Sequence, residues 1–157
     1  MPVVLPYQER FRAAFETLNR EWIDAYFRLE DADRAVFADP AAAILAPGGQ
    51  IFFVVEGDAV LGTCAVVRHN AELCEIAKMG VAAAARGRGY GDLLMETAIA
   101  FCRDIGGRRI RIVSNTALEP AIRLYEKHGF LRVPLSAGQG YERANIQLER
   151  ELGERAT

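Results

Sequence analysis

The sequence predicts an α+β domain in which about four helices flank one mixed, largely antiparallel sheet of about six to seven strands. Three observations lead to this class. Apolar residues first recur at helical spacing, β-branched runs separated by short polar turns follow, and then a strand, a helix and another strand come in succession. Because a strand–helix–strand unit is right-handed and its strands are parallel, one strand pair of the sheet is expected to be parallel.

The first part of the chain is predicted to be helical. Apolar side chains recur there at steps of three and four, in the order Phe11, Phe15, Leu18, Trp22 and Tyr26. This spacing predicts an amphipathic helix from about residue 8 to about residue 27. We interpret the stripe as a core-facing surface, with a binding surface as the alternative. A shorter helix is expected over 31–38, and Asp39-Pro40 starts a brief helical turn that ends at Pro47-Gly48-Gly49.

Short apolar runs rich in β-branched residues predict strands at 51–55, 60–67, 72–81, 109–114, 130–133 and 144–149. Glu56-Gly57-Asp58 separates the first two runs and is typical of a hairpin turn, and a turn near Asn70 joins the second run to the third. A helix is expected over 90–105, with Gly106-Gly107 at its end. A further helix over 118–128 is closed by Gly129.

The loop between the strand at 72–81 and the helix at 90–105 carries the pattern R-x-x-G-x-G, formed by Arg86, Gly89 and Gly91. Glycines let backbone N–H groups approach a bulky anion, and the following helix adds free N–H donors and the positive end of its dipole. The loop is therefore predicted to bind a diphosphate, and a flexible turn that only starts a helix is the alternative. A P-loop is excluded because Asp92 and Leu93, not Lys and Ser or Thr, follow the last glycine. A dinucleotide-binding G-x-G-x-x-G is excluded because no glycine stands at the required third position.

The pattern R-x-x-G-x-G resembles the pyrophosphate loop of the GNAT superfamily of acyl-CoA-dependent N-acyltransferases. The segment Leu124 to Phe130 is similar to the L-Y-x-x-x-G-F pattern of the same family. The predicted order of elements also resembles the GNAT fold over nearly the whole length. The resemblance implies a single N-acetyltransferase domain over residues 1–157, with the parallel strand pair at the cofactor cleft and acetyl-CoA as the acyl donor.

The resemblance also implies where acetyl-CoA is held. The strands that end at Val81 and near Ser114 are expected to splay apart around the pantetheine arm. Backbone groups around Met79 and Val81 are expected to bond its amides, and a backbone N–H of the same stretch is expected to stabilise the oxyanion. The remaining cofactor-binding residues are the pyrophosphate-binding Arg86, Gly87, Arg88, Gly89 and Gly91, and Asn115 near the thioester. For Arg88, a solvated surface position is an equal alternative.

Acyl transfer to an amine requires the removal of a proton from nitrogen. An alkylamine with a pKa near 10.4 is mostly protonated, and deprotonating it at pH 7 costs about 4.6 kcal/mol. Glu75 lies on the strand at 72–81. Its separation from Arg86 is the same as in family members that use a strand glutamate as general base. A general base of this kind contributes a factor of about 10²–10⁴ to the rate. The alternative is an outward-facing Glu75 paired with a cross-strand arginine, and Glu72 is a second candidate. If Glu75 is the base, its apolar neighbours Cys74 and Ile76 are expected to raise its pKa.

Tyr125 stands at the family's tyrosine position and is expected to protonate the departing thiolate as a general acid. Its alternative is a packing role in the apolar stripe of the last helix. The acceptor site is expected near the first two helices, where Glu30, Asp31 and Asp33 either attract a cationic amine or serve as helix caps and solvated charge. The polar segment 136–140 is interpreted as a mobile lid or as an inert hairpin loop.

We therefore predict transfer of an acetyl group from acetyl-CoA to a primary amine by direct attack in a ternary complex, since no cysteine is placed to form an acyl-enzyme. A small-molecule amine is favoured over a protein acceptor. The alternative functions are a non-catalytic acyl-CoA sensor and a catalytic subunit that docks a partner. The identity of the acceptor, the acyl chain length and the oligomeric state stay open, a homodimer included.

Composition excludes several other classes. A net charge of −2 argues against a general nucleic-acid role, because counterion release requires a concentrated basic face. Cys64, Cys74 and Cys102, like His69 and His128, have no metal-ligand spacing, so no metal is expected. The chain has no apolar run long enough to cross a membrane, and its N-terminus lacks the pattern of a signal peptide, so we expect a cytoplasmic protein.

Overall fold

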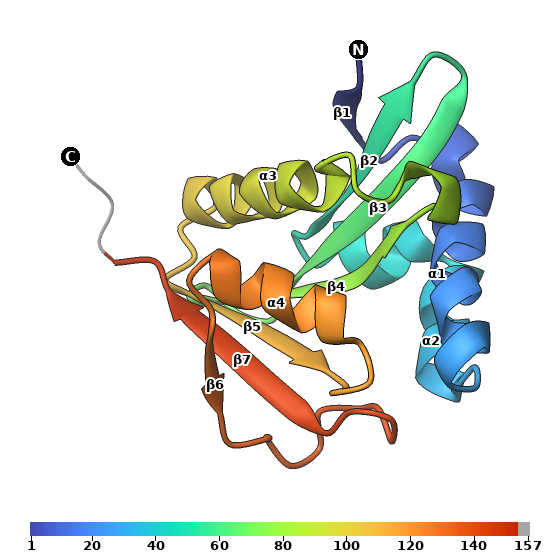
Figure 1. Ribbon diagram of the computed structural model, residues 1–157. Helices are drawn as coiled ribbons and strands as arrows, with labels where there is room; N and C mark the ends of the chain where they lie inside the picture. Colours follow the sequence, from blue (N-terminus) through green and yellow to red (C-terminus); the bar gives the residue numbers. More distant parts are fainter. Residues whose placement is uncertain (154–157) are drawn as a thin grey trace.

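A computed structural model of the protein describes residues 1–153. It contains a 7-stranded sheet in the order β1-β2-β3-β4-β5-β7-β6 (Figure 1). The strands are β1 (Val3–Pro6), β2 (Gln50–Glu56), β3 (Ala59–Arg68), β4 (Leu73–Val81), β5 (Arg109–Ser114), β6 (Leu131–Val133) and β7 (Ile146–Glu151). The helices are α1 (Arg12–Tyr26), α2 (Asp31–Ala38), α3 (Tyr90–Asp104) and α4 (Glu119–Lys127), with short helical turns at Glu9–Phe11, Ala41–Leu45 and Ala83–Ala85. No described helix is both long and apolar enough to cross a membrane.

The predicted fold class is confirmed. All neighbouring strands pair antiparallel except β4 and β5, which are parallel and are joined by α3 as the crossover helix. The strand β1 is not predicted by the sequence pattern. This strand has 4 residues with Pro6 at its end, and its partner is the distant β2, so it carries no local periodicity of its own.

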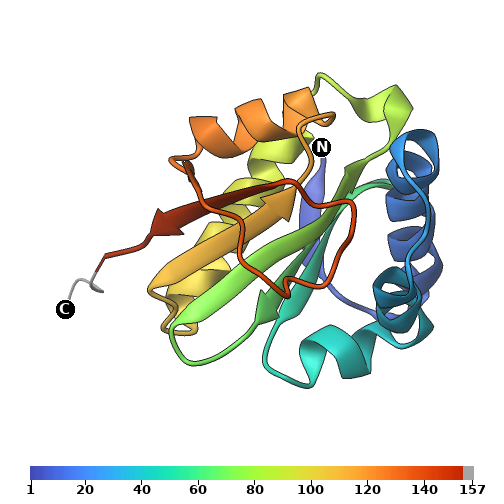
Figure 2. The ribbon, with the colours of Figure 1, turned by 90° about the horizontal axis from the view of Figure 1, so that it is seen from below.

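The sheet is covered on both faces, which explains why its inner strands are continuous apolar runs. Along β2, Ile51, Phe53 and Val55 pack with α1 and α2, whereas Phe52 and Val54 pack with α3. Successive side chains of a strand point to opposite faces, so one strand contributes to two separate cores. Figures 1 and 2 show α1 and α2 on one side of the sheet and α3 and α4 on the other.

The parallel pair β4–β5 separates after a short contact. Leu73 to Glu75 pair with Arg109 to Arg111, and beyond these residues the two strands continue without pairing to each other. On its other side β4 contains a bulge, because Lys78 and Met79 together oppose Cys64 of β3. Lys78 adopts φ 51°, a left-handed conformation that is uncommon for a residue with a side chain. Bulges of this kind turn the strand and redirect its side chains, here at the point where β4 leaves β5.

Gly80 lets α1 lie directly against β4. A Cβ atom at Gly80 would be 2.8 Å from the carbonyl oxygen of Leu18 and 3.3 Å from the Trp22 ring. Backbone atoms cannot move aside as a side-chain end can, so the close approach depends on the missing side chain. Gly80 thereby fixes the distance between the wall formed by α1 and the strand that leaves the sheet.

We predict that Gly80→Ala lowers the free energy of unfolding by about 1–3 kcal/mol, because the added methyl group forces α1 away from β4. Urea unfolding followed by circular dichroism measures the loss. Gly62→Ala on β3 is the matched control, since its new Cβ would first meet the terminal methyl group of Leu94 at 3.3 Å, which can rotate. Equal stability of the two variants would contradict the close-approach argument.

Candidate active site

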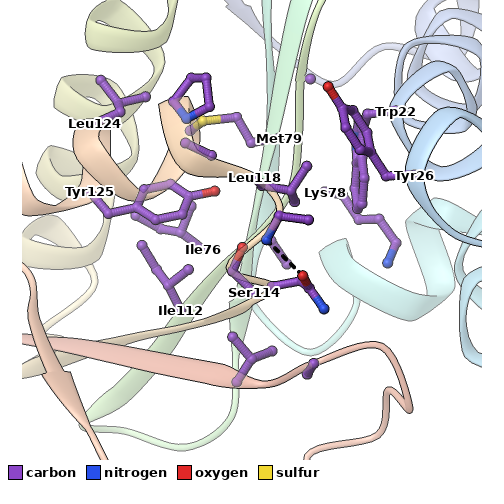
Figure 3. Close-up of a pocket in the computed structure, with 18 of the residues that line it drawn as sticks. Trp22, Tyr26, Ile76, Lys78, Met79, Ile112, Ser114, Leu118, Leu124 and Tyr125 are labelled. Atoms are coloured by element: carbon purple, nitrogen blue, oxygen red, sulfur yellow. Dashed lines mark hydrogen bonds between the residues drawn. The ribbon is translucent and has the colours of Figure 1, made fainter.

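A cleft of about 320 Å³ opens where β4 and β5 part (Figure 3). Its walls come from α1 and the residue that follows it, from β4, β5, the start of α4, and the segment before β7. Of the predicted site residues, those that line the cleft are Glu75, Met79, Val81, Arg86, Gly91, Asn115 and Tyr125. Gly87, Arg88 and Gly89 lie in the loop beside it. The structure therefore brings together residues that the sequence separates by up to fifty positions.

The glycine loop meets the requirements of an anion site. Gly89 is the N-cap of α3 with φ 83°, and no side chain caps this helix. The first N–H groups of α3 are thus left without intrahelical partners at the positive end of the helix dipole. A Cβ at Gly87 or at Gly89 would meet no atom within 4 Å, so the space above the loop is open to a ligand. The phosphates of an acyl-CoA fit these residues.

Gly91 has a different reason to be glycine. A Cβ there would lie 2.9 Å from a methyl group of Leu124. The residue therefore eases the contact of α3 with α4 beside the loop, although the Leu124 side chain could turn aside to accept a Cβ.

The two loop arginines are exposed. Nη2 of Arg86 lies 3.7 Å from Oε1 of Glu21, and Nη1 of Arg88 lies 4.0 Å from Oε2 of Glu56. Ion pairs at such exposed positions contribute little to stability, so both guanidinium groups are free to turn toward an anion. Arg86 borders the cleft and Arg88 does not.

Asn115 already has structural partners. Its side-chain nitrogen donates to the carbonyl oxygen of Arg143 at 2.7 Å, and its side-chain oxygen accepts from the N–H of Ala117 at 2.8 Å. These bonds shape the turn between β5 and α4 and tie it to the segment before β7. The predicted contact of Asn115 with pantetheine or its thioester stays a prediction.

Tyr125 of α4 is buried, and Figure 3 shows its hydroxyl directed toward the middle of the cleft. Burial raises the pKa of this phenol, so it is protonated throughout the neutral range. Within residues 1–153 the hydroxyl makes no hydrogen bond. Every fully buried side-chain oxygen of these residues has a hydrogen-bond partner, so the Tyr125 oxygen is not fully buried and is open to solvent. Tyr125 packs in the core and its hydroxyl faces the cleft, whereas its role as general acid stays a prediction.

Glu75 stands at the narrow end of the cleft, where β4 and β5 part. Its Oε1 accepts a hydrogen bond from Nη2 of Arg111, the residue opposite on β5, at 2.8 Å, and contacts Nε2 of His69 at 2.8 Å. The predicted raised pKa is wrong: burial acts upward, but the bonds from His69 and Arg111 and the Arg111 charge hold the pKa of Glu75 below its usual value. The cross-strand arginine pairing of the alternative is present in the structure. The Oε2 atom has no partner among the described residues and is not buried, so it stays accessible. Glu72, the second candidate, is exposed and lies outside the cleft.

A buried ion cluster at the α1 side of the cleft was not predicted. Nζ of Lys78 donates to Asp33 Oδ1 and to the hydroxyl of Tyr141, both at 2.8 Å. Both terminal nitrogens of Arg143 donate to Asp33 at 2.6 Å. Although burial alone would raise it, these bonds hold the pKa of Asp33 well below its usual range. The cluster joins α2, β4 and the segment before β7.

Glu30 and Asp33 form the capping box of α2, and Glu30 also accepts the N–H groups of Glu142 and Arg143. The structure thus favours the helix-cap alternative for these two carboxylates. Asp31 is fully exposed and pairs with Arg34. In Figure 2 the segment between β6 and β7 arches past the ends of β4 and β5 toward the side of α1 and α2. The lid role of residues 136–140 stays a prediction.

Comparison with known proteins identifies the family. The model of the acetyltransferase (GNAT) family matches residues 11–130. The chain belongs to the GNAT family. This is the family that the loop and the L-Y-x-x-x-G-F pattern predicted.

This GNAT chain matches only a part of its curated relatives, and its sequence identity to the similar solved structures is low. A mycothiol acetyltransferase of Corynebacterium glutamicum is 35% identical over 80 residues, which cover 51% of the chain and 27% of that protein. A GNAT acetyltransferase structure from Staphylococcus aureus has a TM-score of 0.89 at 16% identity, covering 98% of the chain and 100% of the other. A phosphinothricin acetyltransferase from Sinorhizobium meliloti, solved in complex with AcCoA, has a TM-score of 0.76 at 18% identity, covering 97% and 89%. At these identities the structural likeness shows the shared fold.

The residues of this GNAT cleft that sequence reasoning missed share one property: their partners are distant in the chain. Lys78 was the best available signal, because a lysine inside an apolar strand is seldom buried without a charged partner. Trp22 and Tyr26 were assigned to the core stripe of α1, but both line the cleft, and Tyr26 is 59% exposed. Helical spacing alone cannot distinguish a core-facing residue from a cleft-facing one at the end of the same stripe.

We predict that Asp33→Asn lowers the free energy of unfolding at pH 7 by about 3–5 kcal/mol, because it leaves buried cations without their anion. The difference from wild type should persist down to about pH 5 and narrow below about pH 4. A carboxylate whose pKa is depressed on folding stabilises the native state above its unfolded pKa, and this contribution is lost as the pH falls through the folded pKa.

Urea unfolding of both proteins between pH 7 and pH 3 measures this difference. Asp31→Asn, two residues away on the exposed side of α2, is the control and should change stability by less than about 0.5 kcal/mol. A difference for Asp33→Asn that does not change with pH would refute the ion-cluster explanation.

Proposed function

We propose that residues 1–157 form a single catalytic domain that transfers an acetyl group from acetyl-CoA to the primary amine of a small molecule, by direct attack in a ternary complex. The observation that carries this proposal is the continuity of the cleft. It runs from Arg86 and Gly91 at the uncapped start of α3, past the Tyr125 hydroxyl, to Glu75 and the cluster around Lys78. One elongated donor and one acceptor fit end to end along such a path.

The donor half of the proposal rests on the loop and the splayed strands. The N–H groups from Gly87 to Gly91 would hold the pyrophosphate, with Arg86 and Arg88 supplying charge. The unpaired edges of β4 and β5 offer backbone groups to the amides of the pantetheine arm, around Met79 and Val81 on the β4 side. The acetyl-CoA complex of the Sinorhizobium meliloti neighbour supports this choice of donor.

The chemistry assigned to the cleft is a single displacement. The acceptor nitrogen attacks the thioester carbonyl, a C–N bond forms, and the C–S bond breaks with release of the thiol. Tyr125 would give its proton to the leaving sulfur, and a backbone N–H of β4 beyond its pairing with β5 would stabilise the oxyanion. The cysteines, which are buried outside the cleft lining, are not used, in keeping with direct attack.

Glu75 would receive the proton that nitrogen loses, through its accessible Oε2 and a bridging water. Its lowered pKa makes it a weaker base than the sequence analysis expected. Glu75 would therefore pass the proton on to solvent and not retain it. His69, which contacts Oε1 of Glu75, connects the carboxylate to the partly exposed surface of the β3–β4 hairpin. An acceptor amine with a pKa well below 10.4 would suit this arrangement, because the removal of its proton then costs less free energy.

The experiment that tests the proposal mixes the pure protein with acetyl-CoA and a panel of primary amines, and follows the release of free thiol. Thiol release that requires both substrates supports the transferase. Acetyl-CoA binding without thiol release for any amine would leave the acyl-CoA sensor as the function. A thermal shift with acetyl-CoA detects binding separately, since ligand at a hundred times its Kd stabilises the native state by about 2.7 kcal/mol.

Tyr125→Phe is predicted to lower kcat by about 10²-fold or more while leaving the Kd for acetyl-CoA unchanged, because only the proton for the leaving sulfur is lost. Steady-state kinetics and calorimetry measure the two quantities. Tyr7→Phe, which removes an exposed hydroxyl bonded to Glu9, is the control and should keep wild-type turnover. An unchanged kcat for Tyr125→Phe would exclude the general-acid role.

Gly89→Ala is predicted to weaken acetyl-CoA binding by at least about tenfold, because the new Cβ enters the space above the α3 donors and disfavours their conformation. Gly57→Ala is a matched control. Gly57 also has a positive φ, 61°, and open space around it, but it lies in the β2–β3 turn.

Both substitutions carry the same backbone cost of about 1–2 kcal/mol. Thermal unfolding should therefore show similar stability losses for the two variants, and calorimetry should show a loss of affinity only for Gly89→Ala. An unchanged Kd for Gly89→Ala would show that the pyrophosphate lies elsewhere.

A further inference from the structure

The α1 side of the cleft carries an uneven distribution of charge. Within the described chain, the charged side chains that line the cleft are Lys78, Arg86, Arg143 and Glu75. Glu75 is neutralised by Arg111, whereas the acids that balance Lys78 and Arg143 are not part of the lining. Asp33 is 0% exposed and does not line the cleft. An acceptor in the cleft therefore meets the cations first.

Both cations retain hydrogen-bond donors for a ligand. The ammonium of Lys78 has three N–H groups and donates to two partners, Asp33 and Tyr141. The guanidinium of Arg143 uses Nη1 and Nη2 on Asp33. Its Nε has no hydrogen-bond partner within residues 1–153. Every fully buried side-chain nitrogen of these residues has a partner, so the Nε–H of Arg143 is not fully buried and is open to solvent.

The rings of Tyr141 and Trp22 are already occupied by cations. Arg143 lies 4.6 Å from the Tyr141 ring and 5.3 Å from the Trp22 ring, and Lys78 lies 4.3 Å from the Tyr141 ring. A cage of such rings would otherwise attract a cationic acceptor. Here it holds the protein's own cations in fixed positions, which disfavours a positively charged acceptor and prepares the site for a negatively charged group.

We propose that the acceptor is an amine that also bears a carboxylate, as an amino acid does, and that Lys78, Arg143 and Tyr141 bind this carboxylate. Figure 3 shows Trp22, Tyr26 and Lys78 on one side of the cleft and Tyr125 on the other, so the carboxylate lies on the α1 side while the amine faces the thioester. The inference rests on the proposed acetyltransferase function and names its substrate class.

The same charges act on the acceptor amine. Cations close to an ammonium group disfavour its protonated form, so the pKa of the bound amine is lowered. The neutral amine is the nucleophile, and a larger fraction of it at pH 7 reduces the demand on Glu75. The carboxylate-binding cluster and the weakened base therefore form one consistent arrangement.

The test uses the unmodified protein with acetyl-CoA and a panel of L-amino acids, each paired with its own amide and with the amine that lacks the carboxyl group. Free thiol release gives kcat/KM for each. We expect the carboxylates to exceed their amides by about 10- to 100-fold, which is the range for charge-assisted hydrogen bonds. The amide's amino group is the less protonated of the two, so without carboxylate recognition the amide would react at least as fast.

A variant locates the recognition. Arg143→Gln is expected to lower kcat/KM for the best carboxylate acceptor by about tenfold or more relative to the loss for its amide, and to leave the Kd for acetyl-CoA unchanged. Arg132→Gln, at an exposed pair with Glu126, is the matched control. If Arg143→Gln does not fold, the comparison of acceptors on the wild-type protein decides alone.

The outcomes separate this inference from the proposed function. Amides, simple alkylamines or polyamines that react as well as the carboxylates would overturn the carboxylate inference and leave the acetyltransferase intact. Equal losses with both acceptor types in Arg143→Gln would also overturn it. Failure of every amine to release thiol would overturn the proposed function, and the inference with it.

Discussion

The parting of β4 from β5 beyond Glu75 and Arg111 is the constraint on which the rest of the structure depends. Each strand keeps its other neighbour, β3 and β7 respectively, so the sheet remains continuous while two strand edges are left unpaired. Exposed backbone N–H and C=O groups require partners, and here an extended amide-containing ligand or water can supply them. The partly buried ion pair between Glu75 and Arg111 holds the strands together at the narrow end of the cleft, and the bulge at Lys78 turns β4 away beyond it.

The positive charge at the two ends of the cleft has different structural origins. At the start of α3, backbone donors and exposed arginines create a positive site without burying any charge. At the α1 side, Asp33 and Lys78 are buried and Arg143 is partly buried beside them, and the desolvation of these ions is offset by short hydrogen bonds. With Glu30, which lies 3.6 Å from Arg143, the acids balance the two cations, and because neither acid lines the cleft the cluster still presents positive charge to it. The same residues anchor the segment before β7 to α2, so the shape and the charge of the acceptor end are coupled.

Prediction from sequence succeeded where the signal was local. The strand at 109–114 and the helix over 31–38 agree with β5 and α2 residue for residue, because turn residues and caps mark their ends. Prediction failed where the signal came from a partner elsewhere in the chain. The strand β1 has no pattern apart from its pairing with β2, and the raised pKa expected for Glu75 ignored an arginine thirty-six positions later in the sequence. For the same reason Trp22 and Tyr26 could not be separated from the core stripe of α1.

The sequence by itself determined the fold class, the single parallel crossover, the glycine loop at the start of α3 and the position of Tyr125 on the last helix. These properties follow from periodicities and from residue types within about ten positions, because backbone geometry converts such patterns directly into faces and ends of elements. The tertiary structure decided the charge state of Glu75 and the existence of the Asp33–Lys78–Arg143 cluster. Burial and Coulomb interactions act through distances in space, and packing alone brings residues 33, 78 and 143 within a few ångströms of each other.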